Sequence, residues 1–85
     1  MLVRHEGTLV KIRFDRAAPN PARAVEVEVV LEYVPSDDFT VPDNPGILVP
    51  RSMTRTDTRE FLDLTEDEKR LVWREAANYV ATNMR

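Results

Sequence analysis

The chain has 85 residues, of which 42% are hydrophobic and 32% charged, with a net charge of −3 and no cysteine. This length predicts a single domain over residues 1–85, which buries only ~60–65% of the surface that the unfolded chain exposes, so we expect modest stability. Without cysteine, disulfides and thiolate chemistry are excluded, and the acidic balance disfavours a protein that coats nucleic acid through bulk charge.

The N-terminal stretch MLVRHEGTLV contains no long hydrophobic segment and no small-residue cleavage site. It therefore predicts an unprocessed cytoplasmic protein. No apolar run in the chain approaches the length of a membrane span, so we expect no membrane partner.

Two segments alternate apolar and polar residues, which is typical of strands with one buried face. In residues 7–15 the apolar positions include Ile12 and Phe14, and residues 24–34 form the strongest such pattern in the chain. The Pro-Asn-Pro sequence between them predicts a long hairpin loop. An antiparallel register with Phe14 opposite Val25 would also place Arg13 opposite Glu26. The further pairs in that register are Ile12 with Val27, Val10 with Val29 and Lys11 with Glu28.

Residues 35–46, PSDDFTVPDNPG, contain three prolines and predict a loop. Phe39 within it either anchors the crossover to the core or is presented to a partner. Asp37, Asp38 and Asp43 could offer oxygens to a hard cation, but their spacing matches no calcium loop, so we expect solvated acids and no metal site.

The sequence of residues 46–59 does not determine whether they form a strand or a loop. Residues 46–49 are apolar and compatible with a short strand that Pro50 would end or confine to a sheet edge. Residues 51–59 are rich in threonine and arginine and fit either an edge strand or an extended loop. The apolar residues that follow, Phe61, Leu62 and Leu64, are expected to return the chain to the core.

The sequence LTEDEKRLVW marks the start of a C-terminal helix. Thr65 has the chemistry of an N-cap, and Glu68 three residues later completes a capping box. Glu66 and Asp67 favour the positive end of the helix dipole, so helix initiation explains this acidic run better than a catalytic site does. The helix is predicted from about Glu66 nearly to the end of the chain. Its apolar stripe comprises Val72, Trp73, Ala76, Ala77, Val80 and Met84, with Tyr79 at the margin.

Leu71 falls on the otherwise polar face of this helix, beside the acidic first turn. A single exposed leucine is common. Together with the acids it could nevertheless form a small contact patch.

Little catalytic chemistry is available to the chain. His5 is the only histidine and lies near a terminus that we expect to be mobile, and with only Gly7 and Gly46 no glycine-rich phosphate loop can form. We therefore expect no enzyme activity and no cofactor.

Arg51, Arg55 and Arg59 could contact phosphates, which makes nucleic-acid binding the alternative function. Asp57 and Glu60 interrupt this basic segment and no aromatic residue is interleaved for base stacking, so a solvated basic edge is favoured. The opposite possibility is that acids on the second strand imitate DNA phosphates. The predicted register neutralises that row, which comprises Glu26, Glu28 and Glu32.

Two stretches carry a family resemblance. The sequence VEVEVVLEYVP at residues 25–35, followed after a proline-rich loop by EFLDLTEDEKRLVWREAANY, resembles small uncharacterised proteins encoded in phages and prophages. The matching positions are 25–35 and 62–68, about a third of the chain, and the arginine-rich 51–59 segment departs from the pattern, which has a cleaner strand there. The resemblance implies a phage-derived accessory protein and assigns no catalytic residues.

These patterns together predict an α+β fold, in which a small antiparallel sheet (a hairpin plus one or two short strands) packs against one C-terminal helix. The expected core comprises Ile12, Phe14, Val27, Val29, Leu31, Trp73, Ala76 and Val80. One helix cannot cover both faces of the sheet, and Leu9, Val30 and Val34 form a second apolar strip on the other face.

That strip predicts a protein partner or a homodimer. The function we expect is a non-enzymatic protein-binding module, of the kind with which a phage or prophage binds or inhibits a host protein. The contact residues that we expect are Leu9, Val30, Val34, Phe39 and Leu71. The alternatives are nucleic-acid binding through the arginine segment and a structural subunit of a phage assembly.

Overall fold

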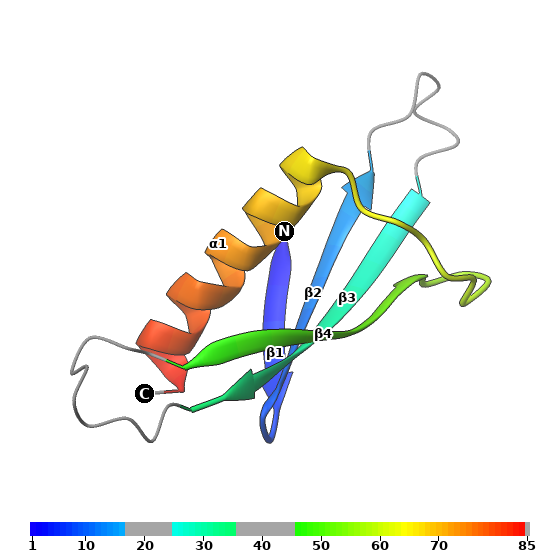
Figure 1. Cartoon of the computed structure of the whole chain (residues 1–85). Coiled ribbons are helices and arrows are strands. Elements are labelled where there is room, and N and C mark those ends of the chain that lie inside the picture. The colour runs from blue at the N-terminus through cyan, green and yellow to red at the C-terminus, as the bar shows by residue number, and fades with distance from the viewer. Residues whose placement is uncertain (17–24, 36–45, 85) are drawn as a thin grey trace.

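The computed structural model describes residues 1–16, 25–35 and 46–84, and it has the predicted α+β fold. Four antiparallel strands follow one another in a meander, with the sheet order β1-β2-β3-β4, and a single helix packs across one face (Figure 1). The elements are β1 (Leu2–Glu6), β2 (Leu9–Arg16), β3 (Val25–Val34), β4 (Ile47–Arg55) and α1 (Glu66–Asn83). Within these described ranges, no helix is both long and apolar enough to cross a bilayer.

Strand β1 corrects the expectation of a mobile N-terminus. Glu6 pairs with Leu9, so Gly7 and Thr8 form a two-residue hairpin loop. Gly7 has a φ of 57°, a conformation that glycine adopts without steric cost. His5 is therefore held in a strand at the sheet edge.

The register between β2 and β3 differs from the prediction by two residues. Phe14 lies opposite Val27, and Arg13 lies opposite Glu28, whereas Arg16 is the partner of Val25. A shift of two residues keeps every side chain on its predicted face, because strands alternate with a period of two. Patterning therefore predicted the faces correctly and the partners wrongly.

Strand β4 resolves the open question about residues 46–59. Its pairing with β3 runs from Ile47 to Arg55, but the register shifts where Pro50 lies opposite Leu31 and Ser52 lies opposite Val30. Arg51 is the extra residue, which makes a β-bulge. The bulge and the edge position together accommodate the proline, which cannot donate to a ladder.

A tight turn follows β4 and returns the chain along its outer edge. The Arg59 amide donates to the Arg55 carbonyl at 2.9 Å, and the Arg55 amide donates to Glu60 at 3.0 Å. Thr54 then forms a bridge with Phe61. The expectation that Phe61 enters the core is wrong, because its side chain is 71% exposed, whereas Leu64 is buried as predicted.

Helix α1 begins as the sequence predicts. Thr65 accepts from the Glu68 amide at 3.2 Å, and the Glu68 carboxylate accepts from the Thr65 amide at 2.9 Å, which completes the capping box. The same carboxylate receives two hydrogen bonds from Arg16 at the end of β2, at 2.9 and 3.0 Å. Glu68 thus joins the helix start to the sheet.

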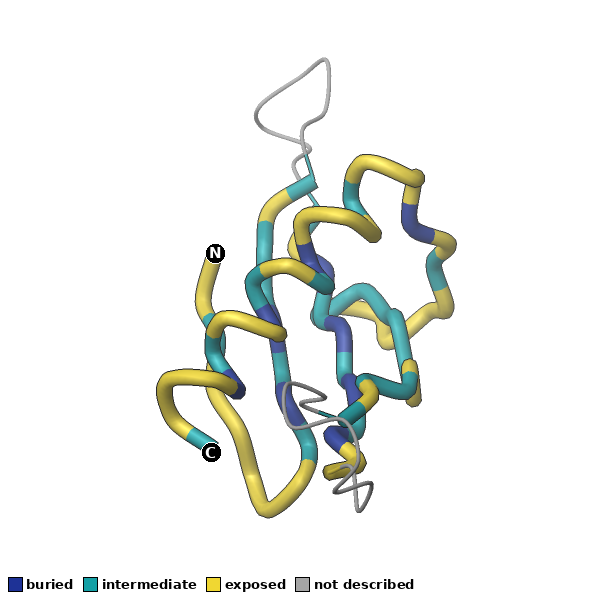
Figure 2. The backbone as a smooth tube through the Cα atoms, turned by 60° about the vertical axis from the view of Figure 1, so that its left-hand side comes forward, coloured by how far each residue is buried: buried dark blue, intermediate teal, exposed yellow. Residues whose placement is uncertain are grey.

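The hydrophobic core lies between α1 and the sheet, and buried positions recur on the strands and on the helix (Figure 2). Phe14 and Trp73, which we expected inside it, are half-buried and pack against its edge. The buried apolar residues are Val10, Ile12, Val27, Val29, Leu31, Tyr33, Leu64, Val72, Ala76 and Val80.

Candidate binding surfaces

The face of the sheet that α1 does not cover carries a group of apolar side chains. Along each strand these residues alternate with core residues such as Val10 and Leu31, so they point away from the helix. None of them belongs to the buried core or packs against it. We define the open-face patch as Leu9, Val30, Val34, Ile47 and Val49.

Pairing across the strands brings these residues to one end of the face. Glu32 lies between Leu9 on β2 and Val49 on β4, and the next pair along is Val34 with Ile47. Val30 precedes Glu32 by two residues on β3, so it is diagonal to Leu9 and Val49 on the neighbouring strands and within reach of both. Three residues of the patch, Leu9, Val30 and Val34, were predicted from the sequence.

The charged residues around the patch are paired within the chain. Arg13 donates to Glu28 at 2.7 Å, and this hydrogen bond holds the pKa of the Arg13 guanidinium above its ordinary value. Arg51 pairs with Glu32. Lys11, which faces Val30 instead of the predicted Glu28, pairs with Glu6 at 3.1 Å. Glu28 and Glu32 are both neutralised, whereas Glu26 lies opposite Asp15 instead of the predicted Arg13 and has no ion pair among the described residues. With two of its three acids neutralised, the row on β3 is a poor imitation of DNA phosphates.

Leu71 lies on a different surface from the open-face patch. It is 39% exposed and lines a depression with Met1 and Phe14, on the side of the sheet that carries α1. Phe39 lies outside the described residues. The predicted protein-binding residues therefore do not form one continuous surface.

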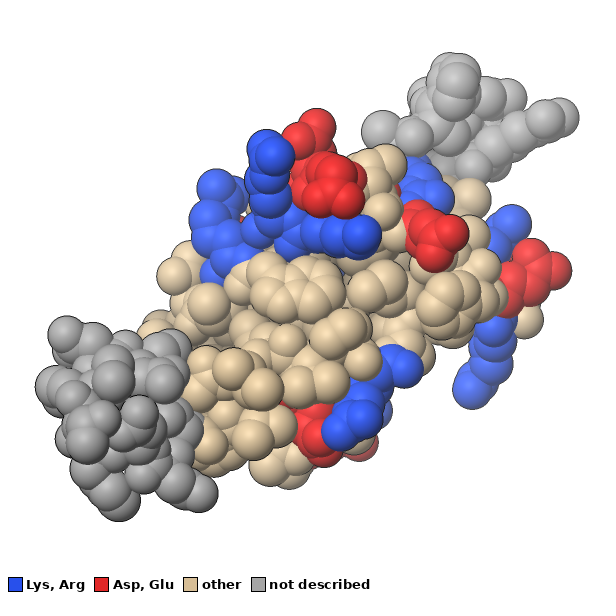
Figure 3. Space-filling view, viewed as in Figure 1, with Lys and Arg blue, Asp and Glu red and all other residues tan. Residues whose placement is uncertain are grey.

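A groove between α1 and β4 was not predicted as a site. It has a volume of about 490 Å³, and an uncharged band separates the charged side chains of α1 from those near β4 (Figure 3). Its walls are formed mainly by Leu48, Trp73, Ala77, Val80 and Ala81. Ala77 of the predicted helical stripe lines this space, and its small side chain is the signal that the sequence offered, whereas Ala81 was not part of the predicted stripe.

The predicted nucleic-acid-binding arginines do not form one row of free cations. Arg51 pairs with Glu32, and Arg55 donates twice to Asp57, at 2.9 and 3.0 Å. The hydrogen bond from Arg55 is the main reason that the pKa of Asp57 lies below its ordinary value. In the part of the chain that the structure describes, Arg59 has no ion-pair partner.

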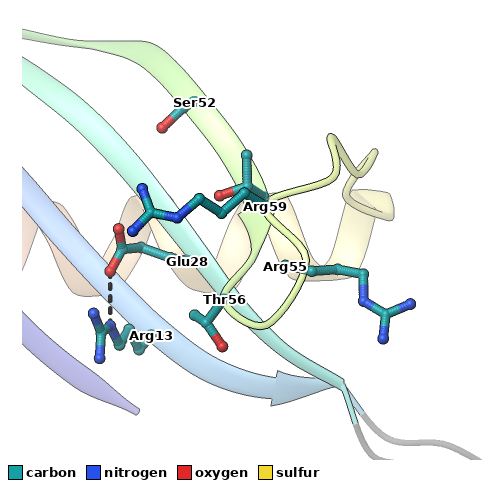
Figure 4. A pocket seen from close by; sticks show the side chains of 7 residues that line it. Arg13, Glu28, Ser52, Arg55, Thr56 and Arg59 are labelled. Atoms are coloured by element: carbon teal, nitrogen blue, oxygen red, sulfur yellow. Dashed lines mark hydrogen bonds and ion pairs between the residues drawn. The ribbon is translucent and has the colours of Figure 1, made fainter.

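A polar pocket of about 290 Å³ lies on the open side of the sheet, at the opposite end from the apolar patch. In Figure 4 the Arg59 side chain extends back toward Glu28, whereas Arg55 points away from the pocket. The residues that line it are Arg13, Glu28, Ser52, Thr54, Arg55, Thr56 and Arg59. The sequence suggested Arg55 and Arg59 as a site, but not the pocket that the three strands build around Arg59.

His5 and Tyr79 form a contact between β1 and α1. The His5 Nδ1 and the Tyr79 hydroxyl are 2.7 Å apart, and the rings meet edge-on with their centroids 5.5 Å apart. Within residues 1–16, 25–35 and 46–84, no group of three or more His, Asp or Glu side chains is arranged to hold a metal ion. The three loop aspartates considered above, Asp37, Asp38 and Asp43, lie outside these ranges.

Comparison of the chain with protein-family models, with curated proteins and with solved structures finds no match in any of the three.

Proposed function

We propose that this chain is a non-enzymatic protein-binding module that docks through the open face of its sheet. The single observation that carries the proposal is the open-face patch, an apolar surface that no described element covers. In proteins, apolar residues gathered on an exposed face mark contact sites for other proteins. The partner we infer presents an apolar surface of its own.

The surroundings of the patch suit a protein interface. Interfaces combine apolar side chains with polar ones. Here Lys11 is paired with Glu6, and Glu32, which lies within the patch between Leu9 and Val49, is paired with Arg51. Docking would therefore desolvate apolar side chains without stranding an unpaired charge. The same pairing makes nucleic acid the weaker candidate, since Arg51 and Arg55 are both neutralised.

The biological setting belongs to the same proposal. The resemblance of residues 25–35 and 62–68 to phage and prophage proteins supports an accessory protein that works in the bacterial cytoplasm on a host protein.

Affinity capture from a bacterial lysate tests this proposal. The tagged chain is incubated with lysate, one half of which is treated with nuclease, and bound proteins are identified by mass spectrometry. We expect one stoichiometric protein that survives nuclease and is lost with Val30→Glu. Captured material that disappears after nuclease treatment would instead support the arginine segment, Arg51 to Arg59, as the site.

Matched variants locate the contact. Asn78→Glu adds the same charge on an exposed position of α1 and should leave capture unchanged. Leu71→Glu tests the surface on the helix side of the sheet and should also leave capture unchanged. Capture that Leu71→Glu abolishes and Val30→Glu preserves would contradict the open-face assignment.

Size determination at several concentrations separates a host partner from self-association. A dimer that Val30→Glu converts to monomer would make a second copy the partner. Larger assemblies would favour the structural-subunit alternative.

A further inference from the structure

The polar pocket at the far end of the open face combines hydroxyl groups from one strand. Ser52 and Thr54 lie opposite Val30 and Glu28 on β3, and Thr56 continues the same alternation just beyond β4. Alternate residues on a strand stand ~7 Å apart on one face. In the described part of the chain these three side chains have no hydrogen-bond partner, so their hydroxyls are available to a ligand.

Arg59 reaches this row from the turn that follows β4. Its φ of 60° is uncommon for a residue other than glycine, and it is held there by the hydrogen bond from its amide to the Arg55 carbonyl. This backbone conformation lets the side chain extend back over the strands toward Glu28 (Figure 4). Unusual backbone conformations persist where the surrounding structure enforces them and are frequent at ligand sites.

The Glu28 carboxylate lies among the guanidinium groups at the pocket. Glu28 accepts from Arg13 at 2.7 Å and lies 3.9 Å from Arg4, which also stands on the open face. Arg59 adds a third positive charge, whereas Arg55 is paired with Asp57 and points away. Glu26 and Asp15, which lie opposite each other on β3 and β2, add negative charge to the same face, and Glu26 acts on Arg13. Among the described residues that line the pocket, Arg59 is the cation without an ion pair. Glu28 lies between Arg13 on β2 and Thr54 on β4, and its hydrogen bond from Arg13 fixes the position of that guanidinium.

We propose that this pocket binds a terminal phosphoryl group, either as inorganic phosphate or as a phosphomonoester. Guanidinium groups donate in a planar fork that matches phosphate oxygens, and serine and threonine hydroxyls supply further donors. A phosphodiester backbone would need a row of cations along the strand, but Arg51 and Arg55 are held by Glu32 and Asp57. The pocket therefore suits a single terminal group. The inference is independent of the protein-binding proposal.

Amide-resolved NMR titration of the ¹⁵N-labelled full chain tests the inference. The probes are inorganic phosphate and an N-acetylated, C-amidated phosphoserine, each compared with sodium chloride at matched ionic strength. We expect saturable shifts at Ser52, Thr54, Thr56 and Arg59, with dissociation constants on the order of 1–10 mM. Tighter binding of the phosphoserine would point to a phosphorylated protein side chain, and equal binding to free phosphate.

Two variants separate binding from folding. Arg59→Gly suits the positive φ and removes the guanidinium, so it should fold at least as well and bind phosphate about tenfold more weakly. Thr54→Val keeps the side-chain shape and should weaken binding about threefold. The control is Arg70→Gln, which removes an exposed arginine of α1 that lies 3.8 Å from Asp67 and should change nothing.

Three results would overturn the inference. If sodium chloride produces the same chemical-shift changes as phosphate, the changes are due to ionic strength and not to phosphate binding. Binding that Arg59→Gly leaves unchanged would remove the pocket from the interaction. An oligonucleotide without terminal phosphates that binds the same residues more tightly than phosphate would contradict a terminal-group site.

Discussion

The two faces of the sheet are built from the same strands, but one is covered by α1 and the other is open. Val29 and Val30 are neighbours of identical chemistry, yet Val29 is fully buried under α1 and Val30 is half-exposed on the open face. On the covered face, strands and helix exclude water from a continuous core. On the open face, ion pairs and apolar side chains alternate with nothing described above them. We infer that stability resides mainly on the covered face, so the open face can change without loss of the fold.

Replacing each of the two valines with alanine tests most directly whether stability resides on the covered face. It also has the largest expected effect on the free energy of unfolding. Val29→Ala removes buried apolar surface and leaves a cavity, so we expect unfolding to become easier by about 2–3 kcal/mol. Val30→Ala should cost less than about 1 kcal/mol, because its side chain is already partly in water. Urea unfolding followed by circular dichroism measures both. Equal losses would show that the open face is part of the core.

The ion pair between Glu68 and Arg16 lies at the edge of the covered face, and it tests whether that face also supplies pH-dependent stability. Burial raises the pKa of Glu68, but hydrogen bonds from Arg16 and from the Thr65 amide outweigh it, so the pKa of this carboxyl lies below its ordinary value. A depressed folded-state pKa contributes stability above the ordinary pKa, and this contribution is lost as the pH falls through the folded value. The Glu68 side chain is 17% exposed and that of Arg16 31%, so solvent partly screens this ion pair.

We therefore expect Glu68→Gln to cost about 1–2 kcal/mol at neutral pH. It should also flatten the decline of stability in acid. Urea unfolding of both proteins across the acid range measures the two effects. A variant that matches the parent protein at neutral pH but declines as steeply in acid would assign the pH dependence to other carboxylates.

Replacing Arg59 has the smallest expected effect on stability, and it should raise the stability of the chain instead of lowering it. Replacing it with glycine relieves a positive φ, so Arg59→Gly should stabilise the chain by about 0.5–1 kcal/mol. Thermal unfolding measures the gain. Arg70→Gln again serves as the control, and destabilisation by Arg59→Gly would mean that the arginine side chain supports the turn.

Local patterns predicted much of this fold from the sequence. Period-two alternation placed β2 and β3 and assigned their faces, and Thr65 with Glu68 located the helix start almost to the residue. These signals succeed because each depends on neighbours in the chain: a strand must alternate, and a helix must cap its free amides.

The errors arose where the outcome depends on residues distant in sequence. Alternation cannot distinguish registers that differ by two residues, so Phe14 was paired with the wrong valine. The segment before Gly7 is too short and too polar to indicate a strand without its partner β2. Phe61 looked like a core residue because nothing local shows that it returns along the outer edge of β4.

The candidate surfaces also contain residues that local sequence could place and residues that depend on pairing between distant segments. Leu9, Val30 and Val34 could be placed on the second face from alternation alone, whereas Ile47 and Val49 join them only through the pairing of β4 with β3. The polar pocket could not be predicted, because it depends on the bulge at Arg51 and on the turn that directs Arg59 back over the sheet.

The most direct test of the central claim is a methyl NMR titration of the full chain with the protein identified by capture. If the open face is the docking surface, the methyl groups of Leu9, Val30, Val34, Ile47 and Val49 should shift on binding, while those of the covered face, such as Ile12 and Val72, should not. Shifts confined to Leu48, Val80 and the alanines of the α1–β4 groove would contradict the claim and transfer the binding site to the helix side of the sheet.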